Sequence, residues 1–224
     1  MASHYLFPAV KLLKQKCFPS LSGMKSCQNF SSMQVDETEG ANFKRFAQHW
    51  WDYDGDLQPL HTMNRLRVPF IQNGLCPLTT LSTIDSVCLP LKGTKILDVG
   101  CGGGILAEAL SMLGAEVLGI DLVEEGIKVA QEHVEATSYR WIDHPDLHKP
   151  TYKLTSVQSI TQEYPCQFDA VVASEVLEHV TDWEDMLNNL KQCLKIPINI
   201  DGVTRPLISV RGIMAVIASQ FPAP

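Results

Sequence analysis

Residues 97–104 read Leu-Asp-Val-Gly-Cys-Gly-Gly-Gly, a short apolar run that passes directly into a glycine-rich turn. Four glycines within five residues allow backbone conformations that a side chain would forbid, and they let a ligand lie against the backbone. The dinucleotide motif G-x-G-x-x-G would need a further glycine where this chain has Ile105, and no G-K-[ST] sequence follows for a phosphate loop. Both kinds of nucleotide-phosphate site are therefore disfavoured.

Around this turn, apolar runs of strand length alternate with segments of helical periodicity. We expect strands at Lys95–Val99, Glu116–Asp121, Tyr152–Val157 and Phe168–Ala173. We expect helices at Ile105–Leu113 and Val123–Ala136, the second with Ile127 and Val134 toward the sheet, and a loop over residues 138–151. This alternation predicts an α/β fold in which right-handed crossovers build a parallel sheet with flanking helices. Aromatic and polar residues between about 42 and 70 predict one or two further helices that pack as a lid.

Asp121 ends the expected second strand, 21 residues after Gly100. An acid at this place can accept hydrogen bonds from both hydroxyls of an adenosine ribose. S-adenosylmethionine needs such an acid and a close-packed glycine turn but no phosphate cradle, so the loop and the acid together favour a methyltransferase over a nicotinamide enzyme. Taken alone, Asp121 is equally suited to cap the following helix. Asp98 either lies under the loop as a structural carboxylate or approaches the methionine amine of the cofactor.

The segment Ser174-Glu175-Val176-Leu177-Glu178-His179 follows the expected fourth strand. In a helix, Glu175, Glu178 and His179 would share one side of the surface, which fits a solvated helix face as well as a set of metal ligands. Ligands of open parallel sheets bind beyond the carboxyl ends of the strands, where these side chains emerge. Their position therefore favours a functional role.

A new helix is predicted from Asp182 to about Leu194. Residues 181–184, Thr-Asp-Trp-Glu, have the Thr-x-x-Glu form of a capping box. The apolar residues at helical spacing are expected to be buried, namely Trp183, Leu187, Leu190 and Leu194.

Composition excludes several classes of protein. The chain has 224 residues and a net charge of −7, with no basic cluster of the kind that a nucleic-acid binder needs. Its seven cysteines show no C-x-x-C spacing, which argues against a zinc ribbon or a disulfide scaffold. Residues 1–35 carry four lysines, several serines and no acid, which predicts either a mitochondrial transit peptide or an N-terminus without fixed structure.

Three blocks together resemble one family. The pattern Phe46-(x3)-Trp50-Trp51-Asp52-(x2)-Gly55-(x3)-Pro59-Leu60-His61-(x2)-Asn64-(x2)-Arg67 precedes LDVGCGGGILAE at 97–108 and SEVLEHV at 174–180. The chain is similar over residues 42–195 to the ubiquinone-biosynthesis O-methyltransferases. The resemblance implies a Rossmann-like class I S-adenosylmethionine-dependent methyltransferase fold, divided into a transit peptide (1–35), a helical flank (36–90), a cofactor-binding domain (91–195) and a divergent tail (196–224).

The resemblance also implies a function and a site. The implied reaction is methylation of catechol-type hydroxyls on polyprenylated ubiquinone precursors, on the matrix side of the mitochondrial inner membrane, as a peripheral member of the ubiquinone-synthesis complex. The family's contacts to S-adenosylmethionine fall on Arg67, Gly100, Asp121 and Ser174. Its contacts to a divalent ion, Mg²⁺, fall on Glu175, Glu178 and His179. The alternative for His179 is a catalytic general base that one of the two glutamates orients.

After Lys195 the chain departs from the family. The family continues with Pro-Gly-Gly and a fifth strand, whereas here the sequence is Ile-Pro-Ile-Asn-Ile-Asp-Gly over residues 196–202 and ends at Pro224. We expect the C-terminal strands of the fold to be missing and the fourth strand to be an exposed edge. An inactive form that acts only as a binding component of the complex is therefore the second hypothesis.

Overall fold

The structure is a computed structural model. It describes residues 49–76, 88–142, 144–177, 180 and 182–195, and the backbone of 208–210 and 213–217. The helices are α3 (Gln58–Leu75), α5 (Ile105–Ser111), α6 (Glu124–Ala136), α7 (Tyr139–Ile142), α8 (Val157–Glu163) and α9 (Trp183–Cys193). The strands are β1 (Lys95–Val99), β2 (Glu116–Asp121), β3 (Thr151–Leu154), β4 (Ala170–Ser174), β5 (Ile208–Val210) and β6 (Ile213–Ile217).

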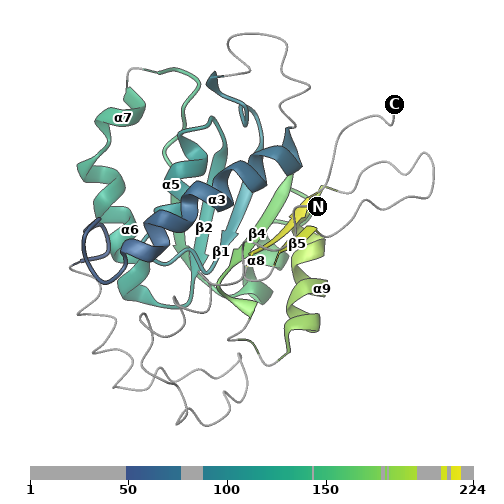
Figure 1. The fold of residues 1–224 in the computed structure, drawn as a ribbon. Helices are drawn as coiled ribbons and strands as arrows, with labels where there is room; N and C mark the ends of the chain where they lie inside the picture. Colours follow the sequence, from purple (N-terminus) through teal and green to yellow (C-terminus); the bar gives the residue numbers. More distant parts are fainter. Residues whose placement is uncertain are drawn as a thin grey trace, which may run out of the picture.

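The strands form one sheet in the order β3-β2-β1-β4-β6-β5 (Figure 1). Strands β3, β2, β1 and β4 are parallel to one another, as the alternation of strands and helices predicts. Strands β6 and β5 are added antiparallel at the β4 side. The α/β fold with a parallel sheet and flanking helices is thus confirmed.

The expectation that β4 is an exposed edge is wrong. Strand β6 pairs with all five residues of β4, from Ala170 opposite Ile217 to Ser174 opposite Ile213. The tail provides this strand because residues 213–217, Ile-Met-Ala-Val-Ile, are apolar and rich in β-branched residues. The prolines of the tail, which would remove ladder hydrogen bonds, all lie outside residues 208–217. The two strands from the divergent tail therefore take the place that we expected to be empty.

Two hydrophobic cores lie on opposite faces of the sheet. Because side chains alternate along a strand, Leu97 and Val99 of β1 face α8 and α9, whereas Ile96 faces α3 and α5. The same alternation in β4 sends Val171 to the first core and Val172 to the second. Figure 1 shows α3 crossing one face of the sheet, with α9 on the side of the sheet where β4 and β5 lie. Asp98 and Ser174, in step with Ile96 and Val172, therefore point toward the α3 face.

Three local expectations need correction. Trp183 is 46% exposed, because the buried stripe of α9 begins one turn later at Met186. The cap of α9 is Asp182, whose side chain accepts a hydrogen bond from Asp185 N, and Thr181 lies outside the described residues. The expected loop over residues 138–151 contains the short helix α7, which the buried Trp141 anchors by donating to Ser111 Oγ at 3.3 Å. The predicted burial of Ile127 and Val134 is confirmed.

Candidate functional site

The predicted cofactor residues meet at the carboxyl ends of β1, β2 and β4. Asp98 lies in the central strand between Gly119 of β2 and Val172 of β4. Ser174 ends β4 and Asp121 ends β2. Arg67, on α3, hydrogen-bonds to Ser174 Oγ, so the helix and the strand end are joined at this place. The fold therefore brings together side chains that lie far apart in the sequence.

Arg67 is a buried cation with donors to spare. Its residue is 5% exposed, and its Nε and Nη2 donate to Asn64 Oδ1 at 2.9 Å and Leu60 O at 3.1 Å. Nη1 donates to Ser174 Oγ at 3.2 Å. Burial lowers the pKa of Arg67, and the nearby charges of Asp98 and Glu175 raise it. A guanidinium carries five N–H donors, so two more can serve a carboxylate such as that of methionine.

Asp98 is a buried acid with an orphaned acceptor. The residue is 2% exposed, and its Oδ2 has no hydrogen-bond partner among the described residues. Burial raises the pKa of Asp98 to about 7, Arg67 lowers it, and Asp121 raises it further. A buried polar atom without a partner is costly unless a ligand completes it. An acceptor beside the Arg67 cation fits the ammonium and carboxylate of one amino-acid group, so the residues present suit the methionine part of S-adenosylmethionine.

Asp121 holds the glycine loop and the start of α6. Its Oδ2 accepts from Gly102 N at 2.8 Å and its Oδ1 from Val123 N at 2.9 Å. Burial raises the pKa of Asp121, and the backbone hydrogen bonds of Val123, Gly102 and Leu122 lower it. The interpretation of this acid as a helix cap is wrong, because the N-cap of α6 is Val123, without a side-chain cap hydrogen bond. The contact of Asp121 with Val123 N holds the turn before the helix. It does not exclude ribose binding, because each carboxylate oxygen has a second lone pair.

The glycines of the loop are required by the protein's own side chains. Gly100, Gly102 and Gly104 have positive φ angles of 69°, 51° and 87°. A Cβ on Gly100 would lie 2.3 Å from Val176 Cγ2, and one on Gly103 would lie 2.2 Å from Trp50 Cδ1. Packed neighbours of the loop therefore exclude a side chain at these positions even without a ligand.

The predicted metal ligands are described only in part. Glu175 directly follows β4 and has a positive φ of 60°, which is strained for a residue with a side chain. Burial lowers the pKa of Arg67, and the negative charges of Asp98 and, less strongly, Glu175 raise it. Glu178 and His179 lie outside the described residues, and within the described part of the chain no group of three His, Cys, Asp or Glu residues could hold a metal ion. The Mg²⁺ site and the role of His179 as a base stay predictions.

Comparisons with known proteins agree with this geometry. Residues 97–196 match the family described as methyltransferase domain. The ubiquinone biosynthesis O-methyltransferase, mitochondrial, of Bos taurus is 45% identical over 186 residues, and the Homo sapiens protein of the same name is 48% identical over 168 residues. This chain is a homologue of the ubiquinone biosynthesis O-methyltransferases. The matched part is 80% and 74% of this chain but only 48% and 42% of those relatives, so the chain spans about half of their length.

A solved structure supports the fold of the methyltransferase domain. The magnesium protoporphyrin IX methyltransferase of Synechocystis PCC 6803, crystallised with bound SAM, aligns with a TM-score of 0.54 and 17% identity. The alignment covers 85% of this chain and 100% of that chain. At this identity the likeness shows the fold alone, which is the Rossmann-like class I fold that the sequence predicts.

Sequence reasoning missed a polar cluster beside the cofactor loop of the methyltransferase domain. Trp51 Nε1 donates to Gly103 O at 3.1 Å, and the ring of Trp51 stacks on that of His133. His133 Nδ1 hydrogen-bonds to Glu108 Oε1 at 2.6 Å, although the side chain of Glu108 is only 3% exposed. The available signal was the acid in the apolar helix sequence Ile-Leu-Ala-Glu-Ala-Leu-Ser, because a buried Glu needs a partner.

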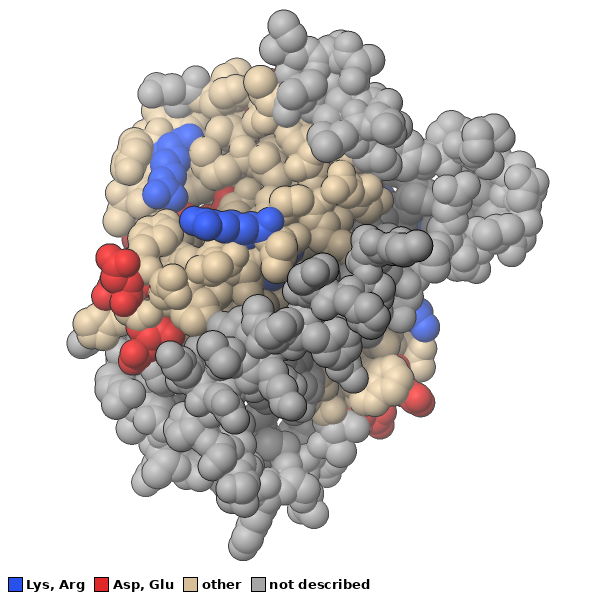
Figure 2. All heavy atoms as spheres, viewed as in Figure 1, with Lys and Arg blue, Asp and Glu red and all other residues tan. Residues whose placement is uncertain are grey.

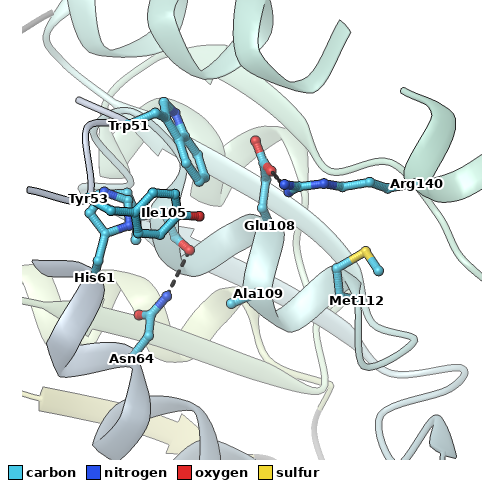
Figure 3. A pocket seen from close by; sticks show the side chains of 9 residues that line it. All are labelled: Trp51, Tyr53, His61, Asn64, Ile105, Glu108, Ala109, Met112 and Arg140. Carbon is cyan, nitrogen blue, oxygen red and sulfur yellow. Dashed lines mark hydrogen bonds and ion pairs between the residues drawn. The ribbon is translucent and has the colours of Figure 1, made fainter. Parts of the chain in front are cut away.

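The cluster borders a pocket of about 160 Å³. Figure 3 shows Glu108 and Arg140 pointing toward each other at its centre, with Trp51, Tyr53 and His61 beside them. The remaining lining residues are Asn64, Ile105, Ala109 and Met112. On the face drawn in Figure 2, the described surface is largely uncharged, and basic side chains flank a hollow with acidic atoms inside it. None of the described helices is both long and apolar enough to cross a membrane.

Proposed function

We propose that this protein is an S-adenosylmethionine-dependent O-methyltransferase that acts on catechol-type hydroxyls of polyprenylated ubiquinone precursors. The observation that carries the proposal concerns Asp98, near the carboxyl end of β1. Its buried Oδ2 has no hydrogen-bond partner among the described residues, and the charge of Arg67 acts on this carboxyl group. The names of the relatives support the substrate class. Both the 3,4-dihydroxy-5-polyprenylbenzoate step and the later demethylubiquinol step need the same chemistry at an aromatic hydroxyl.

Each cofactor residue has a role that its contacts support. Arg67 binds the methionine carboxylate with its two spare N–H donors, and Asp98 accepts from the ammonium. Asp121 accepts from the ribose hydroxyls while it holds Gly102 N. Ser174, which accepts from Arg67, keeps the guanidinium aligned at the end of β4. Gly100 lets the chain turn beneath the bound cofactor.

The reaction is an in-line displacement. An oxygen of the catechol attacks the methyl carbon of the sulfonium, the carbon–sulfur bond breaks, and its electron pair stays on sulfur to give S-adenosylhomocysteine. The hydroxyl proton leaves to His179 or to water, because the neutral hydroxyl is a weak nucleophile. Holding the oxygen and the methyl donor in line provides much of the rate acceleration.

We also propose that Glu175, Glu178 and His179 bind Mg²⁺. The two carboxylates are the hard oxygen ligands that this ion prefers. A divalent ion at this place would lower the pKa of the catechol and orient both of its oxygens. The left-handed backbone at Glu175 supports the proposal, because strained residues concentrate at functional sites.

A location and partners follow from the same proposal. The names of the relatives include the mitochondrion, and the lysine-rich, acid-free residues 1–35 suit a transit peptide. We place the protein at the matrix side of the inner membrane, as a peripheral component of the ubiquinone-synthesis complex without contact to nucleic acid. A second candidate function is an inactive binding component of that complex, which the different sequence after Lys195 favours.

Two measurements on the full chain test the proposal. Calorimetric titration with S-adenosylhomocysteine tests the cofactor site, and transfer of a tritiated methyl group to a catechol analogue tests catalysis with and without Mg²⁺. Binding together with transfer supports the enzyme. Binding without transfer supports the inactive component, and absence of binding by a folded chain refutes both.

A further inference from the structure

The glycine loop is held at its outer side by a tryptophan from a distant segment. Trp51 donates its indole N–H to the carbonyl of Gly103, which is 52 residues further along the chain. On the opposite side of the loop, Asp121 accepts from Gly102 N at 2.8 Å. Two consecutive loop residues are thus fixed, one through its amide and the other through its carbonyl.

Trp51 is itself held by a chain of polar groups that ends on the buried Glu108 and the partly exposed Arg140. Its ring lies parallel to that of His133, with an angle of 3° and a centroid distance of 3.5 Å. His133 Nδ1 contacts Glu108 Oε1 at 2.6 Å, and Arg140 Nη1 donates to Glu108 Oε2 at 3.3 Å. The helices α5, α6 and α7 each contribute one residue to this chain, so three elements fix the orientation of Trp51.

The neighbouring Trp50 covers the same loop with its ring. It is 9% exposed, and its atoms lie where a Cβ on Gly102 or Gly103 would be placed, at 2.5 Å and 2.2 Å. The carbonyl of Trp50 accepts from His61 Nε2 at 2.9 Å, which ties the segment to α3. Trp50 and Trp51 together form what we call the tryptophan bracket.

We propose that Trp51 is a positioning residue for the cofactor, which holds the glycine loop in its binding conformation through the Gly103 carbonyl, with His133 and Glu108 orienting its ring. This inference rests on the proposed function. The physical reason is conformational entropy, since glycines have more freedom to lose than other residues and an unrestrained loop would lose it on binding. A loop that the bracket has already ordered binds the cofactor without that cost. Trp51 needs no contact with the cofactor to act in this way.

The test is the replacement Trp51→Phe, which keeps an aromatic ring against His133 but removes the N–H donor to Gly103 O. Loss of one hydrogen bond that orders the loop is expected to weaken the binding of S-adenosylhomocysteine about fivefold to tenfold by calorimetry. Hydrogen exchange of the amides in residues 97–108 should become faster. The matched control is Trp183→Phe, because Trp183 is exposed on α9 and does not take part in the contacts of the loop. It should change neither quantity.

Steady-state kinetics separates positioning from general loss of structure. We expect Trp51→Phe to raise KM for S-adenosylmethionine while kcat and KM for the catechol stay near those of the unmodified chain. His133→Asn, which removes the stacked ring and keeps a group that can hydrogen-bond to Glu108, should act in the same direction with a smaller effect.

Three results would overturn the inference. The first is cofactor affinity within about twofold of the unmodified chain in Trp51→Phe, because one hydrogen bond is worth more than that. The second is a fall in kcat alone. The third is a Trp51→Phe chain that no longer folds, which would assign Trp51 to the core instead. If the unmodified chain does not bind S-adenosylhomocysteine, the proposed function fails, which is a different result from a variant that binds as well as the parent.

Discussion

Replacement of Asp98 by Asn is expected to make the cofactor-free protein more stable relative to the unmodified chain as the pH rises. The substitution keeps the shape of the side chain and removes its charge. Asp98 is 2% exposed, and its Oδ2 has no partner among the described residues, so ionisation is opposed mainly by loss of solvation. Burial raises the pKa of Asp98 from 3.8 to about 7, although Arg67 acts against this.

The size and sign of the effect follow from the two pKa values. An acid whose pKa is raised in the folded state contributes stability that is present below the unfolded pKa of 3.8 and lost as the pH rises through about 7. The whole difference corresponds to about 4 kcal/mol, at about 1.4 kcal/mol for each pH unit. Between pH 5 and pH 8 the unmodified chain should lose about 2 to 3 kcal/mol of this contribution, whereas Asp98→Asn has nothing to lose.

Urea unfolding of both chains at pH 5 and pH 8, without cofactor, measures this difference. Constant effects of the amide cancel when the two pH values are compared. The control is Asp169→Asn, because both oxygens of Asp169 accept from Lys195 Nζ at 2.8 Å and this variant should be destabilised at either pH. Repeated linear extrapolations can resolve the free energy of unfolding to about 0.5 kcal/mol. If the difference in this free energy between Asp98→Asn and the unmodified chain is the same at pH 5 and pH 8 within that limit, the reasoning is refuted.

The same substitution should abolish the pH dependence of cofactor binding. A cationic amine favours the ionised carboxylate, so binding by the unmodified chain should strengthen from pH 5 to pH 7 and release a proton over that range. Asp98→Asn should bind S-adenosylhomocysteine at least about tenfold more weakly at pH 8, because a charge-assisted hydrogen bond is lost. Calorimetry in two buffers with different ionisation enthalpies detects the released proton, and an equal proton count for both chains would contradict the assignment of Asp98.

Three further perturbations test other parts of the structure. Gly103→Ala would place a Cβ 2.2 Å from Trp50 Cδ1, and we expect a loss of about 1 to 3 kcal/mol in urea unfolding that the added Trp50→Leu change partly restores. Burial raises the pKa of Glu108 to about 7 and lowers that of His133 to about 4, so folding stability falls as the pH rises through 7 for the first and as it falls through 4 for the second. Between about pH 4.5 and 6.5 these two effects cancel, which leaves the fall of stability with pH that Asp98 causes. Glu108→Gln removes one of the two effects, so in urea unfolding its stability should fall less with rising pH than that of the unmodified chain. Glu178→Ala should keep cofactor binding and lose methyl transfer, and a chelator should abolish transfer by the unmodified chain; transfer that survives the chelator would refute the metal role.

Local patterns in the sequence predicted the four parallel strands, and the place of Asp121 at the end of the second, because both depend on short-range features. The runs Lys95–Val99 and Glu116–Asp121 have strand length and apolar character, and they are strands in the structure. Asp121 could be placed because a strand end fixes its position. The stacking of Trp51 on His133 could not be predicted, since it joins residues 82 positions apart whose neighbours in the sequence give no signal of the contact.

Trp183 and the tail failed for a different reason. Helical spacing assigned Trp183 to the buried stripe of α9, but spacing defines a face and does not say how far along the helix the packing extends. The tail was expected to leave β4 exposed because its sequence departs from the family after Lys195, although the apolar run Ile213–Ile217 is long enough to pair with β4. In both cases the burial or pairing of a segment depends on a second element that packs against it. The sequence of the segment alone does not show where that element lies.

The pairing of β6 with β4 supports the proposed cofactor site and has no direct part in catalysis. Arg67, Asp98 and Asp121 lie on α3, β1 and β2, and the pairing of β4 with β6 satisfies the backbone of the strand that ends at Ser174. Strand β4 is paired with β1 on one side and with β6 on the other, which holds its end in place and keeps Ser174 in contact with Arg67. These contacts serve the proposed cofactor site and not the acceptor, so cofactor binding and methyl transfer can be lost separately. Cofactor affinity should therefore be close to that of the Homo sapiens relative even if the rate of methyl transfer is much lower, and an affinity that falls together with the rate would show that the pairing of β6 does not hold the end of β4 in place.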